Sequence, residues 1–227
     1  MEKTSEGKLL ELATRICTEE NLSLDALRKG RSYDAIYLVG QTEANEESVL
    51  RRCYQIIRDT CTEVRKICLV RSQFPPEKRK YPNFAVDWKR WLSSRSSSAL
   101  AVGFSIFDFP EGPVEHTGTE MMGLVSHSKK QDWKDVLLIA APFHQLRSFL
   151  SAVAATRKLD YPVRLWNLLG VSLPWGEQSV HSQGVQTGTR SDFIHAELEK
   201  VKVYSARGDI ATVEEGIEYL NWRDAQK

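Results

Sequence analysis

The chain has 227 residues, of which 41% are apolar and 27% are charged, as is typical of a soluble globular protein with enough length for one sizeable core. The 31 basic and 30 acidic residues leave a net charge of +1, so no overall field attracts the chain to nucleic acid or to an anionic membrane. No apolar run approaches 18 residues, and neither a membrane-spanning helix nor a membrane partner is expected.

The N-terminus and the cysteines both favour a cytoplasmic protein. The first twenty residues, MEKTSEGKLLELATRICTEE, are polar and mixed in charge, without the apolar core of a signal peptide. The cysteines, Cys17, Cys53, Cys61 and Cys68, form no C-x-x-C pair, and we interpret them as reduced, mostly buried thiols. The five histidines are scattered along the chain, so no metal site is predicted.

In chain order, the apolar residues first show helical spacing and then the short runs of a sheet. Residues 4–29 carry helical periodicity, and we expect a helical extension over residues 1–30. Short apolar runs predict buried parallel strands at 33–40, 66–71, 98–104, 135–141 and 161–169. Helical patterns separate most of them, at 49–60, 119–130 and 144–158. Two more helices are expected within 191–227, the first at about 191–206 and the second capped by Thr212 and Glu215.

This alternation of strand and helix predicts an α/β fold. We expect a single domain over residues 1–227, a Rossmann-like three-layer sandwich with a mostly parallel central sheet of about five strands and helices on both faces. In such folds, ligands bind beyond the carboxyl ends of the strands, where the strand order reverses. The residues that follow each predicted strand are therefore the candidates for a site.

The first predicted strand ends in Gly40 and Gln41. We expect Gly40 to let the backbone turn sharply and approach a ligand. Asn45 is expected to cap the next helix, whose free N–H groups could hold an anion. The alternative is a simple connection between strand and helix. There is no G-x-G-x-x-G sequence here, so the usual dinucleotide fingerprint is absent.

The segment after the second strand is basic and aromatic. Seven basic and two acidic residues lie between Arg71 and Arg95. The aromatic residues among them could stack on bases: Tyr81, Phe84, Trp88 and Trp91. The alternative, which we favour, is an amphipathic helix packed by three of these rings, because Phe84, Trp88 and Trp91 have helical spacing.

Polar residues also follow the third and fourth strands. Thr117 is predicted to cap a helix with Glu120 as its capping-box partner, which would turn the Thr117 hydroxyl and the helix N–H groups toward the ligand edge. A helix beginning near 143–144 would place His144 and Arg147 one turn apart on one face. Arginine forks onto a carboxylate or phosphate, and histidine transfers protons near neutral pH. Alternatively, Arg147 pairs with a carboxylate of the protein and His144 caps a backbone group.

The fifth strand is followed by a long stretch, residues 170–193, rich in Gly, Ser, Thr and Gln. Its length favours a lid or a binding loop over a plain connection. We expect Ser191 or Asp192 to cap the next helix, and Arg190 lies at the entry to that helix.

Four blocks of the sequence resemble the YdcF-like and SanA-like family of bacterial proteins. They are YDAIYLVGQ (33–41), EHTGTEMM (115–122), VLLIAAPFHQLRSF (136–149) and GTRSDFIHAELEKV (188–201). The chain departs from the family at 71–73, where RSQ replaces Ser-Gly-Gly, and at Glu120, where the family commonly has Asn. The resemblance implies a Rossmann-like sheet and binding of S-adenosylmethionine or a related nucleotide. It also implies a set of site residues: Gly40, Thr117, Glu120, His144 and Arg147.

Three function hypotheses follow. The first is a cytosolic protein that binds a small anionic ligand of the nucleotide type, with S-adenosylmethionine as the candidate cofactor. Its ligand-binding residues would be Gly40, Gln41, Thr117, Glu120, His144, Arg147 and Arg190. If it is an enzyme, a transferase or hydrolase fits best, with His144 as the catalytic acid or base.

The second hypothesis is a metal-assisted enzyme of sugar-phosphate or cell-envelope precursor metabolism. The residues nearest to a carboxylate cluster for it are Asp108, Glu111, Glu115 and Glu120. The third is a nucleic-acid-binding module using residues 71–95, which the near-neutral charge makes the least favoured.

Overall fold

The computed structural model describes residues 4–29, 32–59, 66–70, 103–107, 116–181 and 186–226. Five strands form one sheet in the order β3-β2-β1-β4-β5, and every neighbouring pair is parallel. The strands are β1 (Ala35–Leu38), β2 (Lys66–Val70), β3 (Gly103–Phe107), β4 (Asp135–Ala140) and β5 (Arg164–Leu169). The predicted α/β fold with a parallel sheet is therefore confirmed, although β3 begins later than the expected 98–104.

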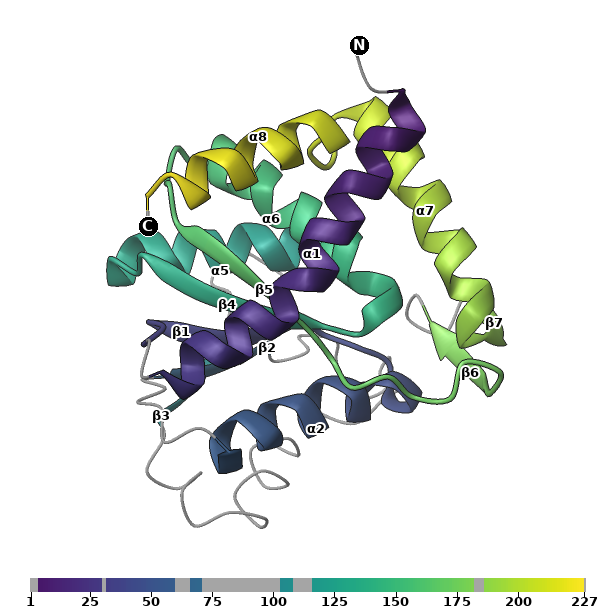
Figure 1. Ribbon diagram of the computed structural model, residues 1–227, viewed down its shortest axis with the longest axis horizontal. Helices are drawn as coiled ribbons and strands as arrows, with labels where there is room; N and C mark the ends of the chain where they lie inside the picture. The colour runs from purple at the N-terminus through teal and green to yellow at the C-terminus, as the bar shows by residue number, and fades with distance from the viewer. Residues whose placement is uncertain are drawn as a thin grey trace.

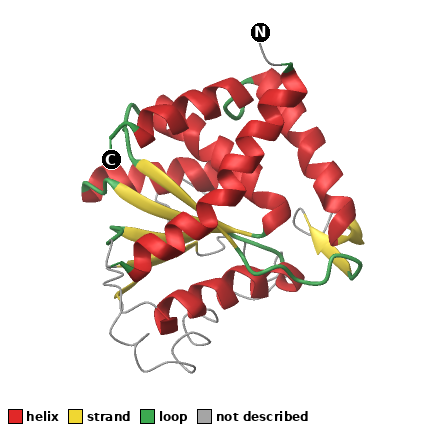
Figure 2. Ribbon diagram, in the orientation of Figure 1, coloured by secondary structure: helices red, strands yellow, loops and turns green. Residues whose placement is uncertain are grey.

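Helices cover both faces of this sheet, as Figures 1 and 2 show. They are α1 (Ser5–Arg28), α2 (Glu43–Asp59), α5 (Thr117–Gln131), α6 (Gln145–Lys158), α7 (Arg190–Arg207) and α8 (Val213–Asp224), with a short 3-10 turn, η2 (Pro142–His144), before α6. Helices α5, α6 and α8 lie on one side of the sheet and α2 on the other. Each described helix is too short or too polar to cross a lipid bilayer.

The buried residues of β1 alternate between two apolar clusters. Tyr37 packs into the cluster under α5 and α6, whereas Ile36 and Leu38 pack into the cluster under α2. This alternation follows from the two-residue period of a strand, and it makes β1 a fully buried central strand, as its apolar run predicted. Cys53 and Cys68 are buried thiols within this packing, as expected, whereas Cys17 is exposed.

A small second sheet was not predicted. Strands β6 (Gln178–His181) and β7 (Gln186–Thr189) pair antiparallel inside the stretch 170–193 that the sequence suggested to be a lid or loop. Along β6, Ser179 and His181 are buried and Gln178 is exposed. The hairpin lies beside the start of α7 (Figure 1), and α7 is capped by Thr189 with Asp192 as the reciprocal partner, rather than by Ser191 or Asp192.

Helix α1 closes the edge of the sheet at β5. Its first half belongs to the cluster under α6 and its last turns to the cluster under α2, so it crosses β5 from one face to the other (Figure 1). The buried Glu19 carboxylate accepts hydrogen bonds from the backbone N–H of Asn167, at 3.0 Å, and from its side-chain amide, at 2.8 Å. Glu19 also pairs with the buried Arg223 of α8, which donates to the carbonyl of Leu165 at 2.7 Å. Glu19 and Arg223 thereby satisfy backbone groups of Asn167 and Leu165 on the open edge of β5.

Glu19→Ala should lower the free energy of unfolding by about 3 kcal/mol, because it removes the buried carboxylate that pairs with Arg223 and accepts from Asn167, and leaves Arg223 only the more exposed Asp224. Urea denaturation followed by circular dichroism measures this change. The control is Glu199→Ala, which removes an exposed ion pair to Lys202 and should cost about 1 kcal/mol or less. Equal losses in the two variants would show that Glu19 does not hold this edge together.

Candidate functional site

The strand order reverses between β1 and β4, because the chain passes from β1 toward β3 on one side and from β4 to β5 on the other. Ligands of parallel α/β sheets bind beyond the carboxyl ends of such a pair. The structure brings several of the predicted residues together at this point, in a connected set of contacts: Gly40, Gln41, Thr117, Glu120 and His144. We call these five residues the polar ring.

Glu120 joins α5 to the end of β1. Its Oε1 accepts the backbone N–H of Gly40 at 2.7 Å and the hydroxyl of Tyr37 at 3.0 Å. The side chain is only 4% exposed. Burial raises the pKa of Glu120 to about 7, although these two hydrogen bonds and the charge of Arg147 act to lower it. This carboxyl therefore exchanges a proton near neutral pH.

The capping prediction for Thr117 and Glu120 is wrong. Helix α5 is capped by His116, whose Nδ1 accepts the N–H of Thr119, and the backbone N–H of His116 in turn donates to Oγ1 of Thr119. The imidazole thus does what the Thr117 hydroxyl was expected to do. As a result Thr117 is the first helical residue, with its side chain buried, and its N–H and that of Gly118 point out of the helix N-terminus.

His144, which follows β4, contacts the end of β1 and the start of α5 through its two ring nitrogens. Nδ1 lies 2.9 Å from Nε2 of Gln41, and Nε2 lies 3.2 Å from Oγ1 of Thr117. The Gln41 amide nitrogen also donates to the carbonyl of Val39, at 3.4 Å. Because a carbonyl only accepts, this contact fixes the amide orientation, and Nδ1 of His144 must accept. Burial and the charge of Arg147 lower the pKa of His144, so the ring is neutral with its proton on Nε2.

With this amide orientation, the carbonyl oxygen Oε1 of Gln41 has no donor among the described residues. Gln41 is 6% exposed. A buried acceptor without a donor costs about 1–3 kcal/mol, and such atoms are rare in folded proteins. A ligand that brings a donor to this oxygen would recover that cost.

Arg147 follows the alternative prediction and pairs with a carboxylate of the protein. Its Nε donates to Glu197 Oε2 at 2.6 Å and its Nη2 to Oε1 at 3.2 Å, while Nη1 reaches Thr117 Oγ1 at 2.9 Å. Both partners of the ion pair are buried. The guanidinium group that the sequence suggested for a ligand therefore binds the carboxylate of Glu197 in α7 instead. The side chain of His144 makes no cap to the helix.

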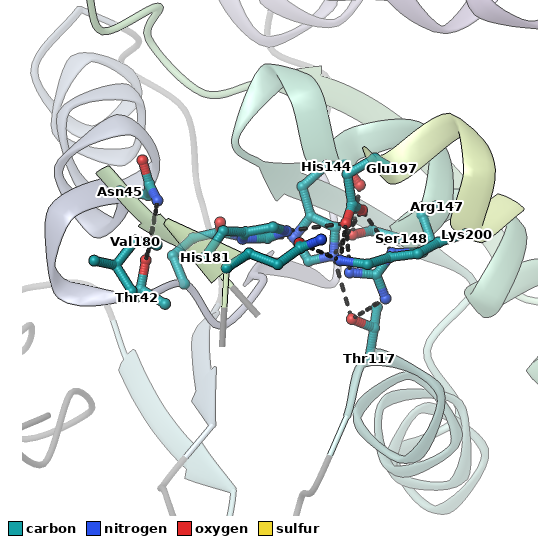
Figure 3. Close-up of polar contacts among 12 residues, drawn as sticks. Thr42, Asn45, Thr117, His144, Arg147, Ser148, Val180, His181, Glu197 and Lys200 are labelled. Carbon is teal, nitrogen blue, oxygen red and sulfur yellow. Dashed lines mark hydrogen bonds and ion pairs between the residues drawn. The ribbon is translucent and has the colours of Figure 1, made fainter. Parts of the chain in front are cut away.

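Glu197 is the centre of a buried polar cluster (Figure 3). Besides Arg147, its Oε1 accepts from Nε2 of His181 at 2.9 Å and from Nζ of Lys200 at 2.8 Å. Burial alone would raise the pKa of Glu197, but the hydrogen bond from His181 and the positive charge of Arg147 outweigh it and hold the pKa far below its usual range. Burial lowers the pKa of His181, so the cluster is an ionised carboxylate between two cations.

Arg190 lies away from the polar ring. It donates to Oδ1 of Asn45, to the carbonyls of Pro174 and Ala44, and to the carboxylate of Glu177. Asn45 itself lies inside the first turn of α2 rather than at its cap, and its amide donates to Thr42 and to the carbonyl of Val180 (Figure 3). Both side chains therefore hold the β6–β7 hairpin against α2, which corrects the roles predicted for them.

Gly40 does not have the conformation expected for a sharp glycine turn. The only positive φ of a glycine in the described ranges is at Gly208, so the backbone at Gly40 is one that any residue adopts. The missing side chain matters instead, because a Cβ there would lie 3.5 and 3.6 Å from the two carboxylate oxygens of Glu120. Gly40 is exposed and has no side chain that would cover this carboxylate.

Sequence reasoning missed Tyr37, His181, Glu197 and Lys200. One signal for Glu197 was present, because Phe193, Glu197 and Val201 fall four residues apart on one helix face and are all buried. A carboxylate in the middle of an apolar stripe implies a buried cation. The hairpin also had a signal, since two short runs on either side of a Gly-containing segment favour a turn.

Some predicted features lie outside the described residues. They are the basic segment 71–95 and the carboxylates Asp108, Glu111 and Glu115. Within the part of the chain that is described, no group of three or more His, Cys, Asp or Glu side chains is placed to hold a metal ion. The sequence matches no protein-family model and no curated protein, and the structure matches no solved structure.

The stability of Glu120→Gln relative to the wild type should be greater at pH 8 than at pH 5. The folded-state pKa of Glu120 is about 7 and its ordinary value is 4.5, so between these values the folded state binds a proton that the unfolded state does not. The stability of the wild type therefore falls as the pH rises through this window, and the variant escapes this loss of roughly 2–3 kcal/mol. Urea denaturation of both proteins at pH 5 and pH 8 measures it.

The exposed Glu199→Gln on α7 is the control for this measurement. Its stability relative to the wild type should be the same at the two pH values. If the stability difference between Glu120→Gln and the wild type were also independent of pH, Glu120 would not titrate near neutral pH in the folded protein.

Proposed function

We propose that the protein binds a small ligand of the nucleotide type at the polar ring, with S-adenosylmethionine as the first candidate. The observation that carries this proposal is the buried Gln41 oxygen without a donor, at the point where the strand order reverses. An unsatisfied acceptor at the usual ligand edge of a parallel sheet is accounted for by a ligand group that donates to it.

Two further features support a ligand here. The N-terminus of α5 faces this edge, and the N–H groups of Thr117 and Gly118 at its first two positions can receive a phosphate or carboxylate. Gly40 is exposed and has no side chain to cover the Glu120 carboxylate. The edge therefore offers both acceptors and helix N–H donors.

The resemblance to the YdcF-like family supports the choice of ligand class. Four of the five residues that the resemblance implies belong to the polar ring: Gly40, Thr117, Glu120 and His144. The strand order agrees with a Rossmann-like fold, in which nucleotides bind at this edge. We take S-adenosylmethionine from this resemblance, and other adenine nucleotides remain within the same proposal.

If the ligand reacts, Glu120 is the better acid or base of the site. Its pKa of about 7 lets it donate or accept a proton at working pH. The neutral His144 is held by Gln41 and Thr117 and has a lowered pKa, so it positions these groups rather than supplying a proton. Transfer or hydrolysis at an activated group remains the reaction class that we propose.

A thermal-shift panel tests the binding proposal. It holds S-adenosylmethionine, S-adenosylhomocysteine, adenine nucleotides and sugar nucleotides, each with and without Mg²⁺. A ligand at 100 times its dissociation constant stabilises the folded state by about 2.7 kcal/mol, which should raise the Tm of a chain of this length by about 5–10 °C.

Gly40→Ala is the matched variant, because the added methyl fits at 3.5 Å from Glu120 without a clash but covers its carboxylate. We expect at least a tenfold loss of affinity with little change in the Tm of the free protein. Gly176→Ala adds a methyl with nothing within 4 Å and should bind as the wild type does. No shift with any compound, or equal shifts in all three proteins, would refute a site at the polar ring.

A further inference from the structure

Two acceptor oxygens at the polar ring lack a donor among the described residues. One is the buried Oε1 of Gln41. The other is Oε2 of Glu120, because both hydrogen bonds to this carboxylate, from Gly40 and Tyr37, end on Oε1. Such oxygens are satisfied by a group that carries a hydrogen on oxygen or nitrogen.

The residues that carry the two oxygens are connected through Gly40, whose N–H donates to Glu120. Gly40 directly precedes Gln41, and its missing Cβ would stand 3.5 and 3.6 Å from the Glu120 carboxylate oxygens. Gly40 therefore places no side chain of its own between the backbone of this strand end and the carboxylate. A single ligand group with two donors, or two neighbouring groups with one each, could meet both acceptors.

The cations that would favour an anion here are already paired. Arg147 is closed on Glu197 by two hydrogen bonds, and Arg190 donates to Asn45 and Glu177. Lys200 is bonded to Glu197 at 2.8 Å. The two oxygens argued above to lack a donor, Gln41 Oε1 and Glu120 Oε2, are acceptors, whereas the sequence alone suggested that cationic side chains would hold an anion.

We infer that the ring holds its ligand through hydrogen-bond donors of the ligand, sugar hydroxyl or amino groups, which Gln41 Oε1 and Glu120 Oε2 accept. This inference rests on the proposed function and specifies which part of a nucleotide-type ligand is recognised. Carboxylates accept ribose hydroxyls in dinucleotide-binding sheets for the same chemical reason. A phosphate is anionic at neutral pH and would be repelled by the ionised Glu120 carboxylate, so these two oxygens do not hold the phosphate that the N–H groups of Thr117 and Gly118 could receive.

The inference fixes the sign of a pH effect. The ionisable groups that act on Glu120 are Tyr37 of β1, whose pKa burial raises so that it stays neutral, and the cation Arg147 of α6. His144 at the end of β4 is also neutral, because burial lowers its pKa. Between pH 6 and pH 8 the charge that changes at the ring is that of Glu120, and the ionised form is the stronger acceptor.

Isothermal titration calorimetry at pH 6 and pH 8 measures this effect with three probes: adenosine, S-adenosylmethionine and inorganic pyrophosphate. A ligand that requires ionised Glu120 should bind about tenfold more tightly at pH 8, because the ionised fraction rises about tenfold around a pKa of about 7. Glu120→Gln should weaken binding at least tenfold and remove the pH dependence. Glu199→Gln, an exposed change of the same kind, should retain both.

The probes separate the sources of the donors. Binding of adenosine with the expected pH dependence would assign the donors to the nucleoside, as its hydroxyls or its N6 amino group. The same behaviour of S-adenosylmethionine without adenosine would assign the amino group of its amino-acid part. Binding of pyrophosphate alone, affinity that falls or stays constant from pH 6 to pH 8, or an unchanged affinity in Glu120→Gln would overturn the inference and leave ligand binding at this edge in place. Failure of these probes and of every compound in the thermal-shift panel would overturn the proposed function itself.

Discussion

The ion pair between Arg147 and Glu197 is the interaction on which the rest of the site depends. It joins α6 to α7, and through His181 it also joins the β6–β7 hairpin to both helices. Removing one partner of a buried pair leaves an uncompensated charge and costs about 3–5 kcal/mol. A ligand that competed for Arg147 would have to offset at least that cost. Ligand recognition is therefore expected from groups of the polar ring that do not take part in this ion pair.

The same cluster sets the electrostatics of the polar ring. Arg147 lowers the pKa of the neutral His144 and moderates the rise in the pKa of Glu120. A carboxyl that titrates near neutral pH, beside a histidine with a fixed tautomer, is the kind of environment found where proteins handle protons. The fold places both residues at the reversal of strand order, so the chemical groups and the ligand edge coincide.

Much of the fold could be predicted from the sequence, because buried parallel strands are short apolar runs and the helices between them carry a 3.6-residue period. Local caps were harder. His116 displaced Thr117 at the start of α5, since any side-chain acceptor with suitable geometry can cap. The partners of Arg147 and Arg190 could not be predicted, because Glu197 and Glu177 lie 50 and 13 residues away in the chain and only tertiary packing brings them together.

A double-mutant cycle tests most directly whether Arg147 belongs to the protein's own framework. Equilibrium unfolding of the wild type, Arg147→Met, Glu197→Met and the double variant gives the coupling energy of the pair. The contacts that each residue makes elsewhere cancel when the changes in unfolding free energy of the single variants are subtracted from that of the double variant. We predict a coupling of about 2 kcal/mol or more, with the double variant less destabilised than the sum of the single changes. Strictly additive losses would contradict the ion pair as the interaction that joins α6 to α7.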